Sequence, residues 1–222
     1  MEQTNQEFLK ACTSGNFAKV CAEISRGTDV NITDGDGRSG LMKCAKRGHV
    51  EIVRILIDNG ADVNLRDNNN KTALMGASKK GHLDIVKLLI ESNCDVNAKD
   101  NNRRTSLMRA CFLGKLDVVE YLIKHGAKVN EADARGRTAL MEAVLAYKID
   151  VIHLLINKDA NLDAQDINGC TCLMRASYGG YTDLVIYLLN KGANKDILDY
   201  ENNKAIHYVR EHCFLELKEY LK

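Results

Sequence analysis

Cysteine pairs at close spacing could bind a metal ion, so they are the first candidates for chemistry. Cys170 and Cys172 are separated by one residue near an expected loop, but a zinc site needs four ligands in recognisable pairs, and no second pair follows. Cys172 takes the place of Ala73 and Ala139 in similar segments, which indicates a packing residue. Cys170 is expected to be an accessible thiol. We therefore predict no metal site and no cofactor.

Histidines give equally little support for catalysis. His207, His212 and Cys213 lie close together near the end of the chain, but no carboxylate pattern completes a ligand set or a catalytic group. His49 and His82 each follow a glycine at equivalent places, where a structural role is expected. No phosphate-binding Gly-rich loop, nucleophilic serine elbow or His-Glu-x-x-His zinc motif is present. The sequence therefore predicts a protein that is not an enzyme and has no catalytic residue.

The composition describes a folded soluble protein. In 222 residues, 31 Lys and Arg balance 30 Asp and Glu, and 45% of residues are hydrophobic. A net charge of +1 argues against a protein that works mainly by wrapping nucleic acid. No apolar run is long enough to span a bilayer, and the polar start lacks a signal-peptide core. Eight scattered cysteines indicate reduced thiols. We expect a cytoplasmic location, with the nucleus as an alternative.

A period of 33 residues runs through the whole chain and dominates its organisation. Each repeat begins with an aspartate: Asp34, Asp67, Asp100, Asp133, Asp166 and Asp199. Seven residues after each aspartate stands Leu41, Leu74, Leu107, Leu140, Leu173 or Ile206. Such a register does not arise by chance, and it predicts stacked copies of one small structural element.

One repeat can be interpreted residue by residue. The turn-rich stretch 67–71 predicts a hairpin-like loop, and Thr72 can cap a short first helix that Gly81 ends. A second helix from about Leu83 has a broad apolar face at helical spacing. Glycines can end the second helices in the left-handed conformation, with Asn93 and Asp159 as substitutes. One such helix pair cannot bury its own apolar faces, whereas stacking on similar neighbours can.

Five residues depart from this pattern, one inside the array and four at its ends. Tyr147 replaces the glycine between two helices, so either it adopts a positive φ at a cost of about 1 kcal/mol or the turn is remodelled. At the ends of the array, apolar positions become polar: Lys19 and Glu23 in the first repeat, and Lys218 and Lys222 in the last. We expect these residues on the outer faces of capping repeats, which have no neighbour there.

Residues 34–66, from Asp-Gly-Asp-Gly-Arg-Ser-Gly-Leu-Met to Gly-Ala-Asp-Val-Asn, closely resemble an ankyrin repeat. The resemblance covers essentially all of the chain. It implies an all-α solenoid of helix–turn–helix units with short hairpin loops, and a concave groove that binds other proteins. The family's Thr-Pro-Leu-His becomes Thr-Ala-Leu-Met at 72–75, which removes the pre-set backbone angle of proline; His207 is the one site that keeps the histidine. Some members of the family are hydroxylated at a Val-Asn step that Asn31, Asn64, Asn97 and Asn130 match, but a structural role is the favoured interpretation.

The register predicts a single domain over residues 1–222. Its expected parts are an N-terminal capping repeat 1–33, internal repeats 34–66, 67–99, 100–132, 133–165 and 166–198, and a C-terminal capping repeat 199–222. We expect this array to be monomeric.

The resemblance places partner contacts on the hairpin tips and on the exposed face of each first helix. On this surface the second to fourth repeats carry basic residues, namely Arg38, Lys43, Lys46, Arg47, Arg66, Lys71, Lys79, Lys80, Arg104 and Arg109. From the fourth repeat onward the residues are apolar or aromatic, namely Phe112, Leu113, Leu145, Ile167, Tyr178, Tyr200 and Tyr208. Solvated lysines on a helix face would explain the basic residues equally well. Clustered apolar and aromatic side chains are more typical of an interface.

The sequence thus predicts a non-catalytic protein–protein interaction module that acts as an adaptor, scaffold or inhibitor. Its expected partner is a protein with an acidic and an apolar segment, and we expect no small-molecule substrate and no membrane. Two alternatives stay open: a nucleic-acid-associated factor that uses the basic residues of repeats two to four, and a regulatory subunit of an enzyme.

Overall fold

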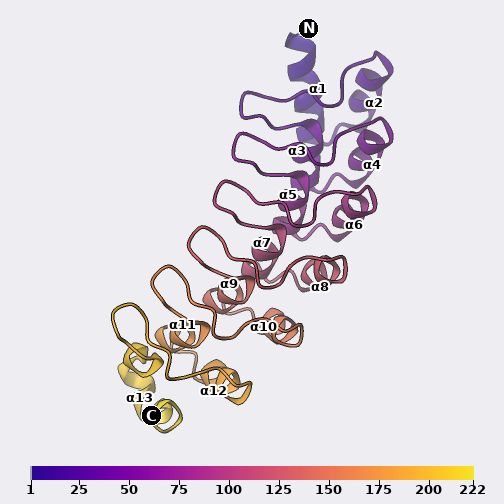
Figure 1. The fold of residues 1–222 in the computed structure, drawn as a ribbon. Coiled ribbons are helices and arrows are strands. Elements are labelled where there is room, and N and C mark those ends of the chain that lie inside the picture. The colour runs from indigo at the N-terminus through magenta and orange to yellow at the C-terminus, as the bar shows by residue number, and fades with distance from the viewer. Residues whose placement is uncertain (1) are drawn as a thin grey trace. The chain divides into compact units, whose positions relative to one another are not determined.

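The structure is a computed structural model that describes residues 2–222 (Figure 1). It divides into two compact units. We call Met1–Ala110 with Lys115–Ala127 the N-terminal unit, and Cys111–Gly114 with Lys128–Lys222 the C-terminal unit. In the described residues every regular element is a helix, and β-structure is limited to two isolated bridges at hairpin bases, Thr33 with Ser39 and Ala132 with Thr138.

Each repeat contributes two helices. The first helices are α1 (Glu2–Ser14), α3 (Gly40–Arg47), α5 (Ala73–Lys80), α7 (Ser106–Phe112), α9 (Ala139–Leu145) and α11 (Cys172–Gly179). The second helices are α2 (Phe17–Ser25), α4 (Val50–Asp58), α6 (Leu83–Glu91), α8 (Leu116–Lys124), α10 (Ile149–Ile156), α12 (Thr182–Asn190) and α13 (Glu211–Leu221). The last repeat begins with a short 3-10 helix, η1 (Ala205–Tyr208).

Within each unit, first helices stack on first helices and second helices on second helices. In the N-terminal unit α3 packs between α1 and α5, and α4 packs on α2 and α6 (Figure 1). In the C-terminal unit α11 packs between α9 and η1, while α12 packs on α13. Side chains such as Leu74, Ile85 and Leu89 are fully buried in these layers. The predicted all-α array of helix–turn–helix repeats is therefore confirmed within each unit.

The predicted helix ends are also confirmed. The Thr72 hydroxyl accepts a hydrogen bond from the Met75 N–H at 3.4 Å, and Gly81 ends α5 with a φ of 82°. Asn93 and Asp159, which replace glycine after second helices, have φ values of 62° and 59°. Tyr147 has a φ of 51°, so the left-handed alternative is the one realised, and its ring centroid lies 4.3 Å from that of Tyr181.

The aspartate that opens each repeat organises the hairpin. Its Oδ1 accepts hydrogen bonds from the backbone N–H groups two and four residues later; for Asp166 these donors are Asn168 and Cys170, at 2.8 and 3.0 Å. In the second, fourth and sixth repeats, its Oδ2 pairs with the cation nine positions later, which is Lys43, Arg109 or Arg175. These aspartates are hidden from solvent in repeats three to seven, so the carboxylates replace water as the acceptor for turn N–H groups.

Asparagine side chains join consecutive hairpins. Asn31 donates through Nδ2 to the Gly60 carbonyl at 3.1 Å and accepts through Oδ1 from the Asp62 N–H at 2.8 Å. Asn64 makes the same pair of bonds to the next repeat within the N-terminal unit, and Asn130 does so within the C-terminal unit. We call these contacts the asparagine ladder. They give the Val-Asn steps the structural role that the sequence favours.

The two terminal repeats differ from expectation in two details. Glu23 is buried, not exposed, because its carboxylate pairs with Arg26 at 2.9 Å and accepts a hydrogen bond from the Thr28 hydroxyl. The first helix of the last repeat shrinks to η1, where the His207 Nδ1 accepts the Lys204 N–H at 2.9 Å. As expected for the end of the array, Leu217 is buried while Lys222 is exposed.

Candidate partner-binding surfaces

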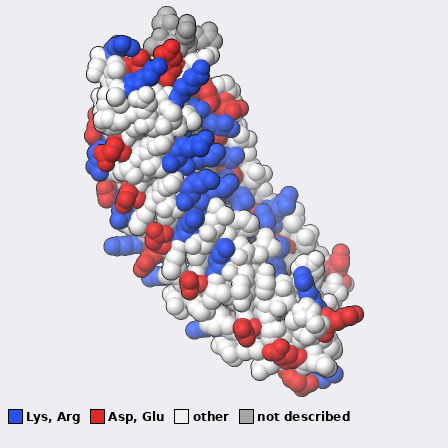
Figure 2. Space-filling model, turned by 180° about the vertical axis from the view of Figure 1, so that it is seen from behind, with Lys and Arg blue, Asp and Glu red and all other residues white. Residues whose placement is uncertain are grey.

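The basic residues of the N-terminal unit fall into two electrostatic classes. Lys43 and Arg109 are tied to the hairpin aspartates Asp34 and Asp100, and both are largely covered. Arg38 is exposed and pairs with Asp36 at 2.9 Å. In contrast, five exposed side chains make no ion pair within the described residues; they are Lys46, Arg47, Lys71, Lys79 and Lys80. We call these five the unpaired cations. Figure 2 shows Lys and Arg side chains gathered in a band on one face of the N-terminal unit.

The unpaired cations come from the last turns of α3 and α5 and from the hairpin before α5. Lysines are favoured at helix C-termini because the helix dipole is negative there. Burial nevertheless lowers the pKa of Lys79, and the positive charges of Arg109, Lys46 and Lys80 lower it further. The ammonium group of Lys79 is therefore within electrostatic reach of these three cations.

A hollow of about 330 Å³ lies among these cations. Its floor is Gly76, which holds the place where the neighbouring repeats have Lys43 and Arg109. Gly76 has no side chain, so the space above it is open. A Cβ added at this residue would lie 3.4 Å from the Cβ of Lys46. The carboxylate of Asp67 also borders the hollow, and its nearest cation is Arg38, at 4.0 Å.

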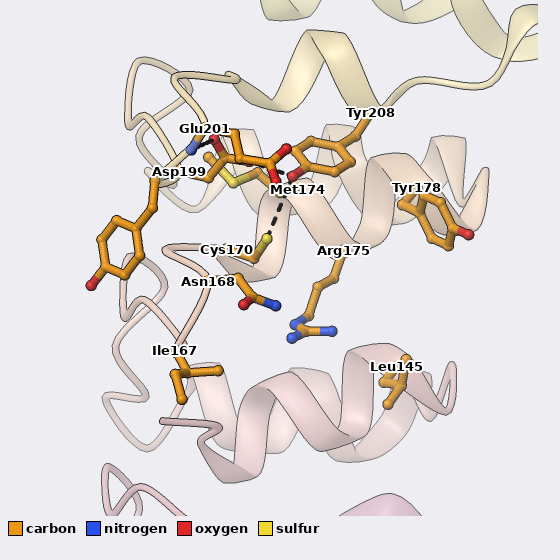
Figure 3. A pocket seen from close by; sticks show the side chains of 11 residues that line it. Leu145, Ile167, Asn168, Cys170, Met174, Arg175, Tyr178, Asp199, Glu201 and Tyr208 are labelled. Carbon is orange, nitrogen blue, oxygen red and sulfur yellow. Dashed lines mark hydrogen bonds between the residues drawn. The ribbon is translucent and has the colours of Figure 1, made fainter. Parts of the chain in front are cut away.

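The apolar residues of the C-terminal unit surround a second, larger pocket of about 450 Å³ (Figure 3). In this view Ile167 from a hairpin tip lies at the lower left, Leu145 from α9 at the lower right, and Tyr178 from α11 above Leu145. Ile167, Tyr178 and Tyr200 are 62%, 65% and 72% exposed. We call this the aromatic pocket.

Three polar residues of the aromatic pocket, Asp199, Tyr208 and Arg175, already have partners. The Tyr208 hydroxyl donates to Asp199, and Arg175 pairs with Asp166. The hydrogen bond from Tyr208, with those from the Asn203 and Glu201 N–H groups, lowers the pKa of Asp199, while the same bond raises the pKa of Tyr208. Cys170 lies 3.6 Å from the Tyr208 oxygen, and burial raises the pKa of its thiol. The surface left for a ligand is therefore mainly apolar.

A family model described as "Ankyrin repeats (3 copies)" matches residues 8–100, 93–166 and 142–222. The chain belongs to the ankyrin repeat family. It is similar to "Ankyrin repeat domain-containing protein 46" of Rattus norvegicus and of Mus musculus, each 43% identical over 54 residues. This match spans 24% of the chain and 24% of each relative.

Ankyrin repeats are generally protein–protein interaction modules and are typically not catalytic. Among the described residues of this ankyrin repeat protein, no three His, Cys, Asp or Glu side chains form a group that could hold a metal ion. Within the same residues, no helix is long and apolar enough to cross a membrane. The eight cysteines are free, and burial raises the pKa of Cys94 and Cys172 to about 12.

The ankyrin register places most of the predicted contact residues on the two surfaces, with a few exceptions. Arg66 is exposed beside the Lys99 carbonyl, and Arg104 is partly covered; neither borders the hollow. Phe112 and Leu113 are 38% and 36% exposed and do not line the aromatic pocket. Six pocket residues were not among the predicted contacts, namely Asn168, Cys170, Met174, Arg175, Asp199 and Glu201. Arg175 could have been predicted, because it is the ninth residue after Asp166, as Lys43 is after Asp34 and Arg109 is after Asp100.

Proposed function

We propose that this ankyrin repeat protein is a non-catalytic adaptor, scaffold or inhibitor that binds a partner protein through the first-helix and hairpin side of its repeats. The observation that carries the proposal is the aromatic pocket. Leu145, Ile167 and Tyr178 expose large apolar surfaces around one open depression, an arrangement typical of interfaces. Because these side chains are 44–65% exposed, complete cover by a partner stabilises each by about 1–2 kcal/mol, roughly half the value for a fully exposed side chain.

The chemistry of the aromatic pocket favours an apolar side chain of the partner. Asp199 is engaged with Tyr208 and with hairpin N–H groups, and Arg175 is engaged with Asp166, so a charged ligand would find no free counter-charge in Asp199 or Arg175. A bulky aliphatic or aromatic side chain loses little hydration on entry and packs against Tyr178 and Tyr200. The basic surface of the N-terminal unit supports a second contact, with an acidic segment.

The test is a peptide-display selection on the full chain, followed by affinity measurements with single variants. Tyr178→Ala and Ile167→Ala are expected to weaken the selected peptides at least about tenfold, a typical loss for an interface anchor. Leu215→Ala is the matched control, because Leu215 on α13 is 86% exposed and outside the pocket. Selected peptides without large apolar residues, or equal affinity for all three variants, would contradict the proposal.

A nucleic-acid-associated function is the second candidate, because the unpaired cations could neutralise phosphates. Binding of that kind weakens steeply with salt. A labelled duplex that shifts with the full chain at moderate salt would support it, whereas the proposed protein-binding function predicts no shift.

A further inference from the structure

The hollow of the N-terminal unit carries an excess of positive charge that the fold does not neutralise. Its lining includes seven basic residues and one acidic residue, Asp67. The Oδ1 of Asp67 accepts the Asn69 and Lys71 N–H groups at 2.8 Å, and its Oδ2 faces Arg38. Lys43 and Arg109 are held by their own aspartates. Arg38 also pairs with Asp36, so Lys46, Arg47, Lys71 and Lys79 are the lining cations without a counter-charge, and their charge favours an anionic ligand.

The hollow is shaped by an omission in the repeat pattern. Position 76 lies midway, in register, between Lys43 and Arg109, and a glycine there removes the side chain that would fill the space. The conformation does not require glycine, because the φ of Gly76 is not positive and an added Cβ would make only an ordinary contact with Lys46. Glycine inside a helix costs about 1 kcal/mol relative to alanine. Gly76 therefore leaves the hollow open at a cost in the stability of α5.

The number and spread of the cations favour a dianion over a carboxylate. Lys46 and Lys79 come from adjacent helices, and Lys71 comes from the hairpin, so they can approach one group from different directions. A phosphate group carries a charge of about −1.5 to −2 and three acceptor oxygens, whereas a carboxylate carries one charge and two oxygens. A phosphate therefore offsets more than one of the positive charges, which a single carboxylate cannot do.

The surroundings favour a phosphorylated side chain over a nucleic-acid backbone. Single-stranded nucleic acids are held by aromatic side chains interleaved with cations. Among the described residues of the N-terminal unit the exposed aromatic side chain is Phe17, on α2, and none lines the hollow. The hollow is also a single depression and not a track of evenly spaced cations.

We infer that the hollow over Gly76 binds a phosphorylated serine or threonine of a partner segment, with Lys46, Lys71 and Lys79 as its donors. This inference rests on the proposed protein-binding function and specifies the modification that one contact reads. Phosphorylation of the partner then switches this contact on. The aromatic pocket is a separate site in the C-terminal unit, so the two contacts can be tested independently.

The experiment measures binding of short labelled peptides to the full chain by fluorescence anisotropy at constant moderate salt. Three peptides differ only in a central phosphoserine, glutamate or serine, and a labelled oligothymidylate is the fourth probe. The inference predicts that the phosphoserine peptide binds at least about tenfold more tightly than the glutamate peptide. Serine is expected to bind more weakly still.

Two variants locate the site. Lys46→Ala with Lys79→Ala removes two donors, and the matched control Arg54→Ala with Lys124→Ala removes the same charge from the second helices. Gly76→Met fills the hollow without changing the charge, and methionine is a better helix former than glycine. Both site variants should reduce the phosphoserine affinity at least about fivefold, and the control should change it less than about twofold.

Three results would overturn the inference: equal binding of the phosphoserine and glutamate peptides, an unchanged affinity in Gly76→Met, or tighter binding of the oligothymidylate. Absence of binding to every probe would overturn it as well. None of these results would affect the Tyr178 and Ile167 comparison, so failure here is distinguishable from failure of the protein-binding proposal.

Discussion

Replacing the hairpin aspartate by asparagine should cost more in the sixth repeat than in the third. Asp166 and Asp67 are both buried, and each accepts two backbone N–H groups through Oδ1 at 2.8–3.0 Å. They differ at Oδ2. Asp166 pairs with Arg175, whereas the corresponding residue for Asp67 is Gly76 and the nearest cation is 4.0 Å away.

The backbone contribution is common to both sites and cancels, because an asparagine oxygen can still accept the two N–H groups. Asp166→Asn also removes a charge-assisted hydrogen bond and turns an amide N–H₂ toward the mostly covered Arg175, at a cost of about 2–3 kcal/mol. Asp67→Asn loses only a longer-range attraction and should cost about 1 kcal/mol. The expected difference between the two variants is therefore about 1–2 kcal/mol.

Urea unfolding followed by far-UV circular dichroism measures this difference. The urea dependence of the unfolding free energy must match among wild type and both variants, because repeat arrays can lose two-state behaviour. A cost for Asp67→Asn equal to or greater than that for Asp166→Asn would refute the assignment of the extra stability to the Arg175 pair. Arg175→Met should reproduce most of the Asp166→Asn loss at that hairpin.

Three further predictions concern strain, acid sensitivity and thiol reactivity. Tyr147→Gly should be about 1–2 kcal/mol more stable than Tyr147→Ala in the same urea assay, because only glycine adopts the positive φ without strain. Burial raises the pKa of Asp34, but hydrogen bonds from Lys43 and the Arg38 N–H outweigh it; the folded-state pKa values of Asp34 and Asp199 both lie below 3.8. The stabilising contribution of these two carboxylates is complete above about pH 5 and is lost as the pH falls through 3.8 and below. The free energy of unfolding of the Asp34→Asn and Asp199→Asn variants should therefore fall less steeply than that of the wild type in an acid titration. An alkylating reagent at pH 8 should modify the half-buried Cys21 in the folded protein and reach Cys172 only on unfolding, as peptide mass spectrometry can show; early modification of Cys172 would contradict its burial.

The repeat register made the helices predictable because each helix end depends on local chemistry. Thr72 and Gly81 act through their own backbone neighbours, and the 33-residue spacing repeats those neighbours. Burial of Glu23 was not predictable in this way, because it depends on Arg26 and Thr28 folding back onto one carboxylate.

The candidate surfaces were predictable as residue lists but not as cavities. The register placed Ile167 and Tyr178 on the same side of the repeats, and the structure adds that they border one depression. The ion-pairing of Lys43 and the freedom of Lys46 could not be separated by residue type, since both are lysines on α3. Their difference comes from the reach of each side chain to the nearest hairpin carboxylate.

The asparagine ladder constrains how this chain can change in length. Asn31 and Asn64 each meet a carbonyl 29 residues and an amide 31 residues further along, so an insertion between partners would displace both at once. Duplication or loss of a whole 33-residue segment leaves every such spacing intact. A whole 33-residue segment is therefore the unit by which this chain can lengthen or shorten. A single inserted residue, even at a hairpin tip, falls between two ladder partners and must bulge out locally to keep their hydrogen bonds.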